Sequence, residues 1–233
     1  MSLPLLHILA ALLLAAVPSA ALAQWQAPEV TMAAAKKGDA AAQYRLGEMY
    51  DLGRGVKQDY AQAVLWYRAA AEQGHAQAQF ALAEMYKNGD GVAKDVAEAV
   101  RWYRRAAQQG EPRAQLLLGV LYESGVGVPK DSAPAAEWYR RSAEQGDPRA
   151  QLLLGNLYAV GQGVPRNAVV AYALYTVSAD TDPKGNPSLA HREQLVRSMS
   201  DAEVEAAKAL AAEMAKPGGI GTALAGALGP VAK

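Results

Sequence analysis

The chain has 233 residues, a formal net charge of zero and no cysteine. This length allows one or two domains, and the balanced charge argues against nucleic-acid binding, which normally leaves a basic excess. Disulfide bonds are excluded, so packing must stabilise the fold. Alanine is abundant and Phe occurs once, a composition that favours closely packed helices.

The first 23 residues have the pattern of a secretory signal. An apolar run from Ile8 to Val17 is followed by Pro18 and by Ala21-Leu22-Ala23, the small-x-small motif that a signal peptidase accepts. We therefore expect cleavage after Ala23 and a periplasmic or secreted protein. No Lys or Arg precedes the run, and the alternative is an uncleaved N-terminus that attaches the chain to a membrane. The run is shorter than the ~20 residues that span a bilayer.

A repeat of 36 residues fills the middle of the chain. The motif G-x-G-V starts at residues 53, 89, 125 and 161. Other residues keep the same register: Leu46, Leu82, Leu118 and Leu154; Tyr50, Tyr86, Tyr122 and Tyr158; Trp66-Tyr67, Trp102-Tyr103, Trp138-Tyr139 and Leu174-Tyr175. This register predicts four units, 38–73, 74–109, 110–145 and 146–182. Residues 24–37 are expected to form a linker and a half-unit helix.

Each unit has the pattern of two helices. In the first unit, Asp39 and Asp59 are the expected N-caps, and Gln62 completes a capping-box arrangement with Asp59. Two apolar stripes at helical spacing follow these caps: Ala42, Leu46, Met49 and Tyr50, then Ala63, Trp66, Tyr67 and Ala70. One helical pair cannot bury both stripes, whereas stacked pairs can. The sequence therefore predicts an all-α fold, an α-solenoid with the three Trp residues in its core.

The pattern A-x-A-Q-x-x-L-G-x-M-Y-x-x-G-x-G-V-x-x-D-x-x-x-A-x-x-W-Y-x-x-A-A-x-Q-G runs from Ala40 to Gly74 and recurs in the next three units. It resembles the Sel-one-like repeat, a relative of the tetratricopeptide repeat. The departures are local: Ala83 replaces a glycine, Pro134 falls early in a second helix, and the fourth unit lacks the Trp. The resemblance implies a non-catalytic interaction scaffold or adaptor in periplasmic or envelope complexes.

Two capping helices are expected over 183–215, the second opened by a capping box of Ser200 and Glu203. The tail, 216–233, is rich in Gly and Ala without a helical stripe, and we expect it to be disordered. The alternative is that the tail docks onto a membrane or a partner.

Gly53-Arg54-Gly55 could be mistaken for a phosphate-binding loop. Such a loop needs a strand before it and Lys and Ser/Thr after it, whereas here a helix precedes it, so we expect a turn. The histidines have no zinc-site spacing, and no nucleophile–base motif occurs. We predict no catalytic, metal or cofactor site. The rival reading is a hydrolase or a protein that binds β-lactams or the cell wall, as implied by cysteine-rich relatives whose cysteines are missing here.

By resemblance to tetratricopeptide repeats, the first helix of each unit lines a concave side. The candidate residues for binding a protein or peptide partner are Tyr44, Gln77, Phe80, Glu84, Arg113, Leu116, Arg149 and Leu152. Arg113 and Arg149 could clamp a carboxylate of that partner. The alternative for the aromatic-to-leucine series is packing within the solenoid.

Overall fold

The computed structural model describes residues 28–182 and 186–228, which form twelve α-helices and no strand. The signal expected at 1–23 lies outside these residues. The helices are α2 (Pro28–Lys36), α3 (Ala40–Leu52), α4 (Tyr60–Glu72), α5 (Ala76–Asn88), α6 (Val96–Gln108), α7 (Pro112–Ser124), α8 (Ser132–Glu144), α9 (Pro148–Val160), α10 (Ala168–Thr181), α11 (Ser188–Val196), α12 (Asp201–Met214) and α13 (Gly219–Leu228).

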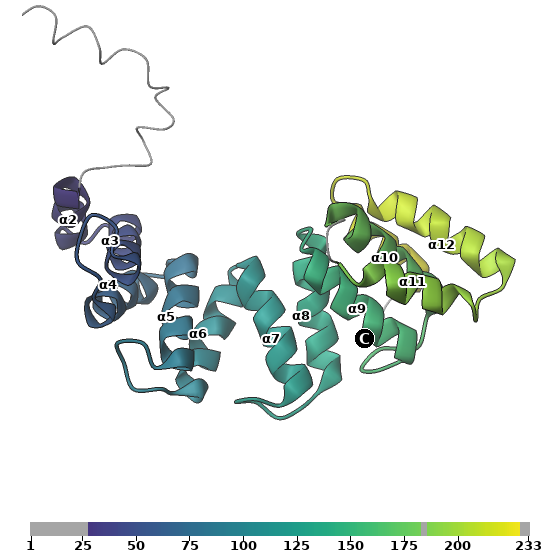
Figure 1. Cartoon of the computed structure of the whole chain (residues 1–233), viewed down its shortest axis with the longest axis horizontal. Coiled ribbons are helices and arrows are strands. Elements are labelled where there is room, and N and C mark those ends of the chain that lie inside the picture. Colours follow the sequence, from purple (N-terminus) through teal and green to yellow (C-terminus); the bar gives the residue numbers. More distant parts are fainter. Residues whose placement is uncertain (1–27, 183–185, 229–233) are drawn as a thin grey trace, which may run out of the picture.

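The predicted α-solenoid is confirmed. Each unit pairs a first helix, helix A (α3, α5, α7 and α9), with a second, helix B (α4, α6, α8 and α10), and each helix B packs on the helix A that follows it. The units follow one another along the long axis of the molecule, with α2 at one end as the predicted half-unit helix (Figure 1).

Side chains cap the helices as the sequence predicts. Asp39 Oδ1 accepts the Ala42 N–H at 2.6 Å, and Asp59 Oδ1 accepts the Gln62 N–H at 3.0 Å. The expected capping box at Asp59 is wrong in one respect. The Asp59 N–H donates to the Tyr50 carbonyl at 2.9 Å, so it does not need the Gln62 side chain. Pro134 lies in the first turn of α8 and does not interrupt it.

The G-x-G motif is a turn, and its two glycines have different tasks. Gly89 ends α5 in the left-handed region, with φ of 88°, and its N–H donates to Met85 O. Gly91 also has a positive φ, 66°, and lies against the start of α4 in the preceding unit. A Cβ at Gly91 would be 2.6 Å from the Ala61 backbone nitrogen. The second glycine therefore lets two units approach each other backbone to backbone.

Tyrosine, leucine and alanine fill the interior. The largest side chains that are almost completely buried include Tyr67, Tyr103 and Tyr139 and the four repeat leucines, Leu46, Leu82, Leu118 and Leu154. Of the predicted core tryptophans, Trp102 is buried, whereas Trp66 and Trp138 are half-buried and pack against the core clusters.

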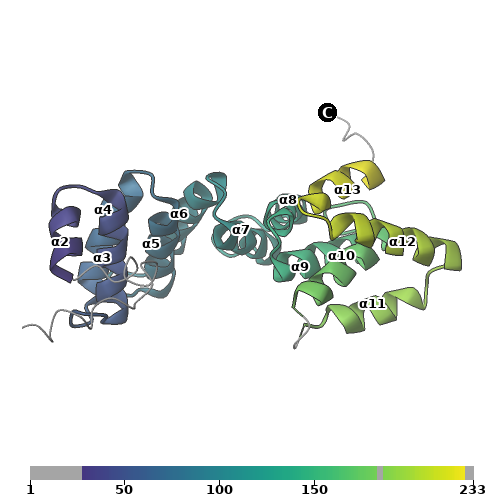
Figure 2. The same cartoon turned by 90° about the horizontal axis from the view of Figure 1, so that it is seen from above.

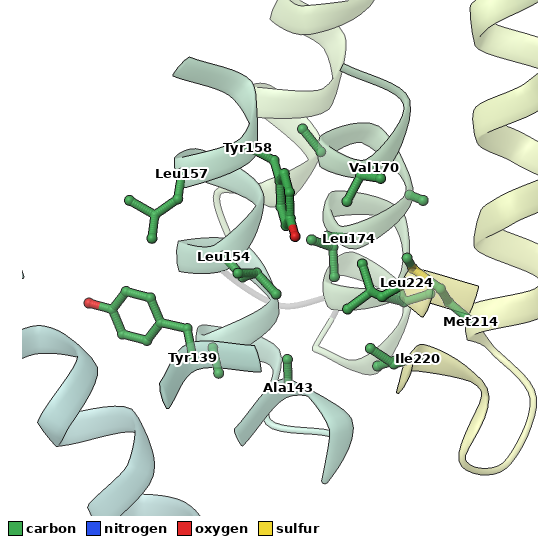
Figure 3. Close-up of a cluster of buried hydrophobic side chains, with 14 of the residues drawn as sticks. Tyr139, Ala143, Leu154, Leu157, Tyr158, Val170, Leu174, Met214, Ile220 and Leu224 are labelled. Atoms are coloured by element: carbon green, nitrogen blue, oxygen red, sulfur yellow. The ribbon is translucent and has the colours of Figure 1, made fainter. Parts of the chain in front are cut away.

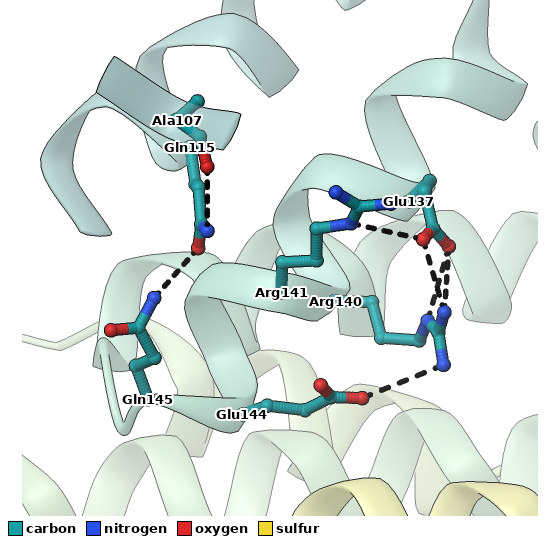
Figure 4. Close-up of polar contacts among 7 residues, drawn as sticks. All are labelled: Ala107, Gln115, Glu137, Arg140, Arg141, Glu144 and Gln145. Atoms are coloured by element: carbon teal, nitrogen blue, oxygen red, sulfur yellow. Dashed lines mark hydrogen bonds and ion pairs between the residues drawn. The ribbon is translucent and has the colours of Figure 1, made fainter. Parts of the chain in front are cut away.

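A ladder of glutamines runs through the same interior. In the third unit, the buried Gln115 donates from Nε2 to the Ala107 carbonyl at 3.1 Å, and its Oε1 accepts Nε2 of Gln145 at 2.8 Å (Figure 4). The equivalent bonds join Gln73 to Gln43 and Gln109 to Gln79. Each buried glutamine lies on a helix A and makes two hydrogen bonds. One joins it to the end of helix B in its own unit, and the other joins it to helix B of the preceding unit. The ladder therefore links successive units.

The C-terminal helices cap the solenoid. Helix α10 packs against α9, α11 and α12, and α13 packs against α12 and α8; α11 and α13 lie on opposite sides of α10 in Figure 2. Ser200 and Glu203 form the predicted capping box. The expected disorder of 216–233 is wrong for 219–228, because α13 buries Ile220, Ala223 and Leu224 in the core (Figure 3).

Candidate partner-binding face

The residues at one position of every helix A define a common side of the solenoid, here called the helix-A face. This position is occupied by Tyr44, Phe80, Leu116 and Leu152, which are 36 residues apart. The first two are half-buried. The structure shows which of the eight predicted partner-binding residues come together on this face.

Tyr44 in α3 is held by polar and aromatic neighbours. Its hydroxyl donates to Glu48 Oε1 at 2.7 Å, and its ring stacks on His75 with 4.8 Å between the centroids. Burial raises the pKa of the Tyr44 phenol; Glu48 raises it further, whereas Arg113 lowers it. Arg113 belongs to α7, the helix A of the third unit, whereas Tyr44 belongs to the first unit. The ring stacking on His75, which begins the second unit, places Tyr44 where the first two units meet.

Arg113 connects this tyrosine to the next aromatic residue. Its guanidinium carbon lies 4.3 Å from the Phe80 ring centroid, a cation–π geometry. Its Nε donates to Glu111 Oε1 at 2.8 Å, and Oε2 of the buried Glu111 accepts the Ala114 N–H at 2.8 Å. The cap at the start of α7 thus fixes one edge of the guanidinium, while the Arg113 side chain stays 49% exposed. We call Tyr44, Phe80 and Arg113 the aromatic–arginine patch.

The other predicted residues are not part of this patch. Glu84 accepts a hydrogen bond from the Tyr103 hydroxyl and pairs with Lys87 at 2.6 Å, so it supports helix packing. Gln77 is exposed beside the patch on α5. Leu116 is 6% exposed and belongs to the core, as the packing alternative predicts.

Arg149 and Leu152 lie in the fourth unit, where the face differs. Arg149 is exposed and pairs with Asp147, the N-cap of its own helix, at 3.0 Å. Arg113 and Arg149 each have a carboxylate partner two residues earlier, so a clamp between them would require both pairs to open. Leu152 is half-buried against the core.

Helix α11 covers the helix-A face at this end. His191 Nδ1 lies 2.9 Å from Asn156 Oδ1, and the imidazole meets the Tyr175 ring edge-on with 5.6 Å between centroids. Asn156 is the fourth-unit equivalent of Glu48 and Glu84. Helix α11 thus contacts the helix-A face at α9, whereas Gln77 on α5 and Arg113 on α7 are exposed.

Sequence reasoning missed His75 and Glu111 at this site. Both are N-caps, of α5 and α7. They stand 36 residues apart and in register with Asp39 and Asp147. The register could therefore have identified them, although not the Tyr44 and Arg113 contacts that they make.

In residues 28–182 and 186–228 no helix is long and apolar enough to cross a bilayer. The same residues contain no group of three or more His, Cys, Asp or Glu side chains placed to hold a metal ion.

Comparison with known proteins shows matches over the repeats. A family model described as Sel1 repeat matches residues 40–75, 76–111, 112–147 and 148–180. A protective antigen of uropathogenic Escherichia coli with an SLR fold is 42% identical over 66% of this chain, with a TM-score of 0.64. A Sel1 repeat protein from Oxalobacter formigenes is 41% identical over 62% of this chain, with a TM-score of 0.59. The aligned part is 33% of the first protein and 59% of the second. No curated protein matches the chain.

Proposed function

Because the chain belongs to the Sel1 repeat family, whose members commonly mediate protein–protein interaction, we propose that it is an exported, non-catalytic scaffold that binds a protein partner through the aromatic–arginine patch. The observation that carries this proposal is the position of the exposed Arg113 guanidinium over the Phe80 ring, on the helix-A face.

The chemistry of the patch suits a protein partner. Tyr and Arg are enriched among the residues that dominate binding energy at protein interfaces. The Arg113 guanidinium is already ordered by Glu111 and by the Phe80 ring, so binding loses little side-chain entropy. Its exposed N–H groups can donate to a carboxylate or a backbone carbonyl of the partner.

Site-specific photo-crosslinking in cells tests this proposal. A photoreactive residue at Gln77, which is exposed beside the patch, should capture a discrete partner. A control at Arg101, whose side chain is 72% exposed on helix B, should not. Adding Arg113→Ala to the Gln77 probe should reduce the captured band at least fivefold. Equal capture at both positions, or capture that survives Arg113→Ala, would contradict the proposed face.

Export is part of the proposal and has its own test. It is supported by the apolar run from Ile8 to Val17 and by Ala21-Leu22-Ala23. Intact mass of the protein from a periplasmic fraction should correspond to a chain that begins at Gln24. A full-length chain that remains with the membrane fraction would support the retained anchor instead.

A further inference from the structure

The glutamine ladder lacks its last donor in the fourth unit. Thr181 stands 36 residues after Gln145, at the place of the donating glutamine. Its shorter side chain donates from Oγ1 to the Val177 carbonyl of its own helix at 2.8 Å. Gln151, which is 2% exposed, keeps its Nε2 contact to Ala143, but its Oε1 has no hydrogen-bond partner among the described residues.

A pocket of about 380 Å³ lies beside the fourth-unit position of the ladder. Gln151 and Thr181 both line it, together with the α12–α13 connection and the end of α8. In the third unit, Gln145 reaches Gln115 Oε1 from the position that Thr181 occupies in the fourth. By this register, a donor at residue 181 would approach Gln151 Oε1 from the side of the pocket that both residues line.

The pocket walls indicate the class of ligand. Val177, Met214 and Ile220 provide apolar surface, and the last two come from the C-terminal helices that close the solenoid (Figure 3). Lys216, also at the pocket, is paired with Glu213 at 2.6 Å. A buried acceptor without a donor is unfavourable, and a neutral N–H group satisfies it without the cost of burying a charge.

We propose that this pocket binds a primary carboxamide on a short aliphatic stem, as in the glutamine side chain of a partner peptide. The carboxamide N–H donates to Gln151 Oε1 and the methylene groups pack on Val177, Met214 and Ile220. The bound side chain thus makes, from a partner, the hydrogen bond that Gln145 makes to Gln115 within the chain. This inference does not depend on the aromatic–arginine patch, none of whose residues lines the pocket.

Titration of the ¹⁵N-labelled chain by NMR tests the proposal with three probes. The first is N-acetylglutamine methyl ester, which carries the carboxamide. The second is the γ-methyl ester of an N-acetylglutamate methyl ester, which has the same shape without the side-chain N–H donor. The third is n-butylamine, which offers an ammonium group. Saturable shifts are expected for the first probe at Thr181, Gly218 and Gly219, which line the pocket, with the second probe binding roughly tenfold more weakly.

Two variants at one position separate ligand binding from folding. Thr181→Gln should supply the missing N–H donor from the chain's own side chain and raise Tm by about 2–4 °C. It should also weaken binding of the carboxamide probe at least fivefold. Thr181→Val, of matched size and without a donor, controls for the loss of the threonine hydroxyl, and the carboxamide probe should bind it more tightly than it binds Thr181→Gln.

Each alternative outcome overturns the proposal. Equal affinity for the amide and ester probes would show that Gln151 Oε1 does not select the ligand. Stronger binding of the amine would assign the pocket to a cation, attracted by Glu144 and Asp180. The absence of saturable shifts with all three probes would mean that the pocket holds solvent only.

Discussion

The hydroxyl of Tyr175 in α10 donates a hydrogen bond to Asn156 Oδ1 in α9, 2.9 Å away. Equivalent bonds join the two helices of the other units: Tyr67 to Asp51, Tyr103 to Glu84, and Tyr139 to Glu123. The tyrosine occupies the same repeat position in every unit. The acceptor occupies one of two repeat positions in helix A, three residues apart. In each unit the phenol at this position is hydrogen-bonded within its own helix pair.

Burial raises the pKa of Tyr175 from its ordinary 10.0 to about 12. Between these values the folded state keeps the proton and the unfolded state loses it, so this stabilisation is complete below pH 10 and is lost as pH rises toward 12. In this pH range the unfolding free energy falls as pH rises, and Tyr175→Phe should make that fall less steep by about 1.4 kcal/mol per pH unit. Urea unfolding at pH 9, 10 and 11 measures it. The exposed Tyr60→Phe is the control, and equal slopes for the two variants would contradict the assignment.

The close approach of Gly91 to α4 can be separated from its backbone conformation. Gly91→Ala combines a strained φ of 66° with a Cβ that meets the Tyr60 and Ala61 backbone. Gly110→Ala places Ala at a φ of 89° with no atom within 4 Å of the new Cβ. We expect a loss of about 1–2 kcal/mol for Gly110→Ala and roughly 2 kcal/mol more for Gly91→Ala. Chemical denaturation checks the difference, and similar losses would mean that the units have room to separate.

The cap of α5 is sensitive to acid, because His75 Nδ1 accepts the Ala78 N–H at 3.2 Å and only a neutral imidazole can accept there. Burial lowers the pKa of His75 below its ordinary 6.5; nearby Arg45 also lowers it, whereas Glu48 and Asp39 oppose the shift. The stabilisation is therefore complete above pH 6.5 and is lost as pH falls through the lowered pKa.

His75→Asn should keep the cap and remove this pH dependence, whereas His75→Ala should cost about 1 kcal/mol even at pH 7.5. Thermal unfolding at pH 5.0 and 7.5 measures both effects. An unchanged pH dependence in the Asn variant would assign it to another group.

Helix α13 should contribute to stability, because Leu224 is 1% exposed within the core. Leu224→Ala is expected to cost about 2–4 kcal/mol. Leu228→Ala in the same helix, at a side chain that is 38% exposed, should change stability by less than about 0.5 kcal/mol. Calorimetry compares the two, and equal effects would mean that α13 does not pack as described.

The repeat register predicted the fold, because identical spacing identifies equivalent positions in every unit. Register does not say which groups touch one another. The glutamine ladder and the contact of Gly91 with α4 are therefore seen only in the three-dimensional structure. At the candidate site, the register placed Tyr44, Phe80 and Leu116 together but could not show that Leu116 is buried. Helix α13 was missed because three glycines and the lack of a polar face obscure it. Packing against α8 and α12 stabilises this helix despite its weak intrinsic propensity.

The backbone contact at Gly91 has a consequence for the geometry of the whole repeat array. Gly163 meets the backbone of Ser132 and Ala133 at the start of α8 in the same way, whereas Gly127 meets the side chains of Val96 and Val100 in α6. At Gly91 and Gly163 the distance between neighbouring units is therefore set by main-chain atoms, which are the same whatever the surface residues are. Substitutions on the open faces can change what the protein recognises without changing the pitch of the superhelix on which those faces are displayed.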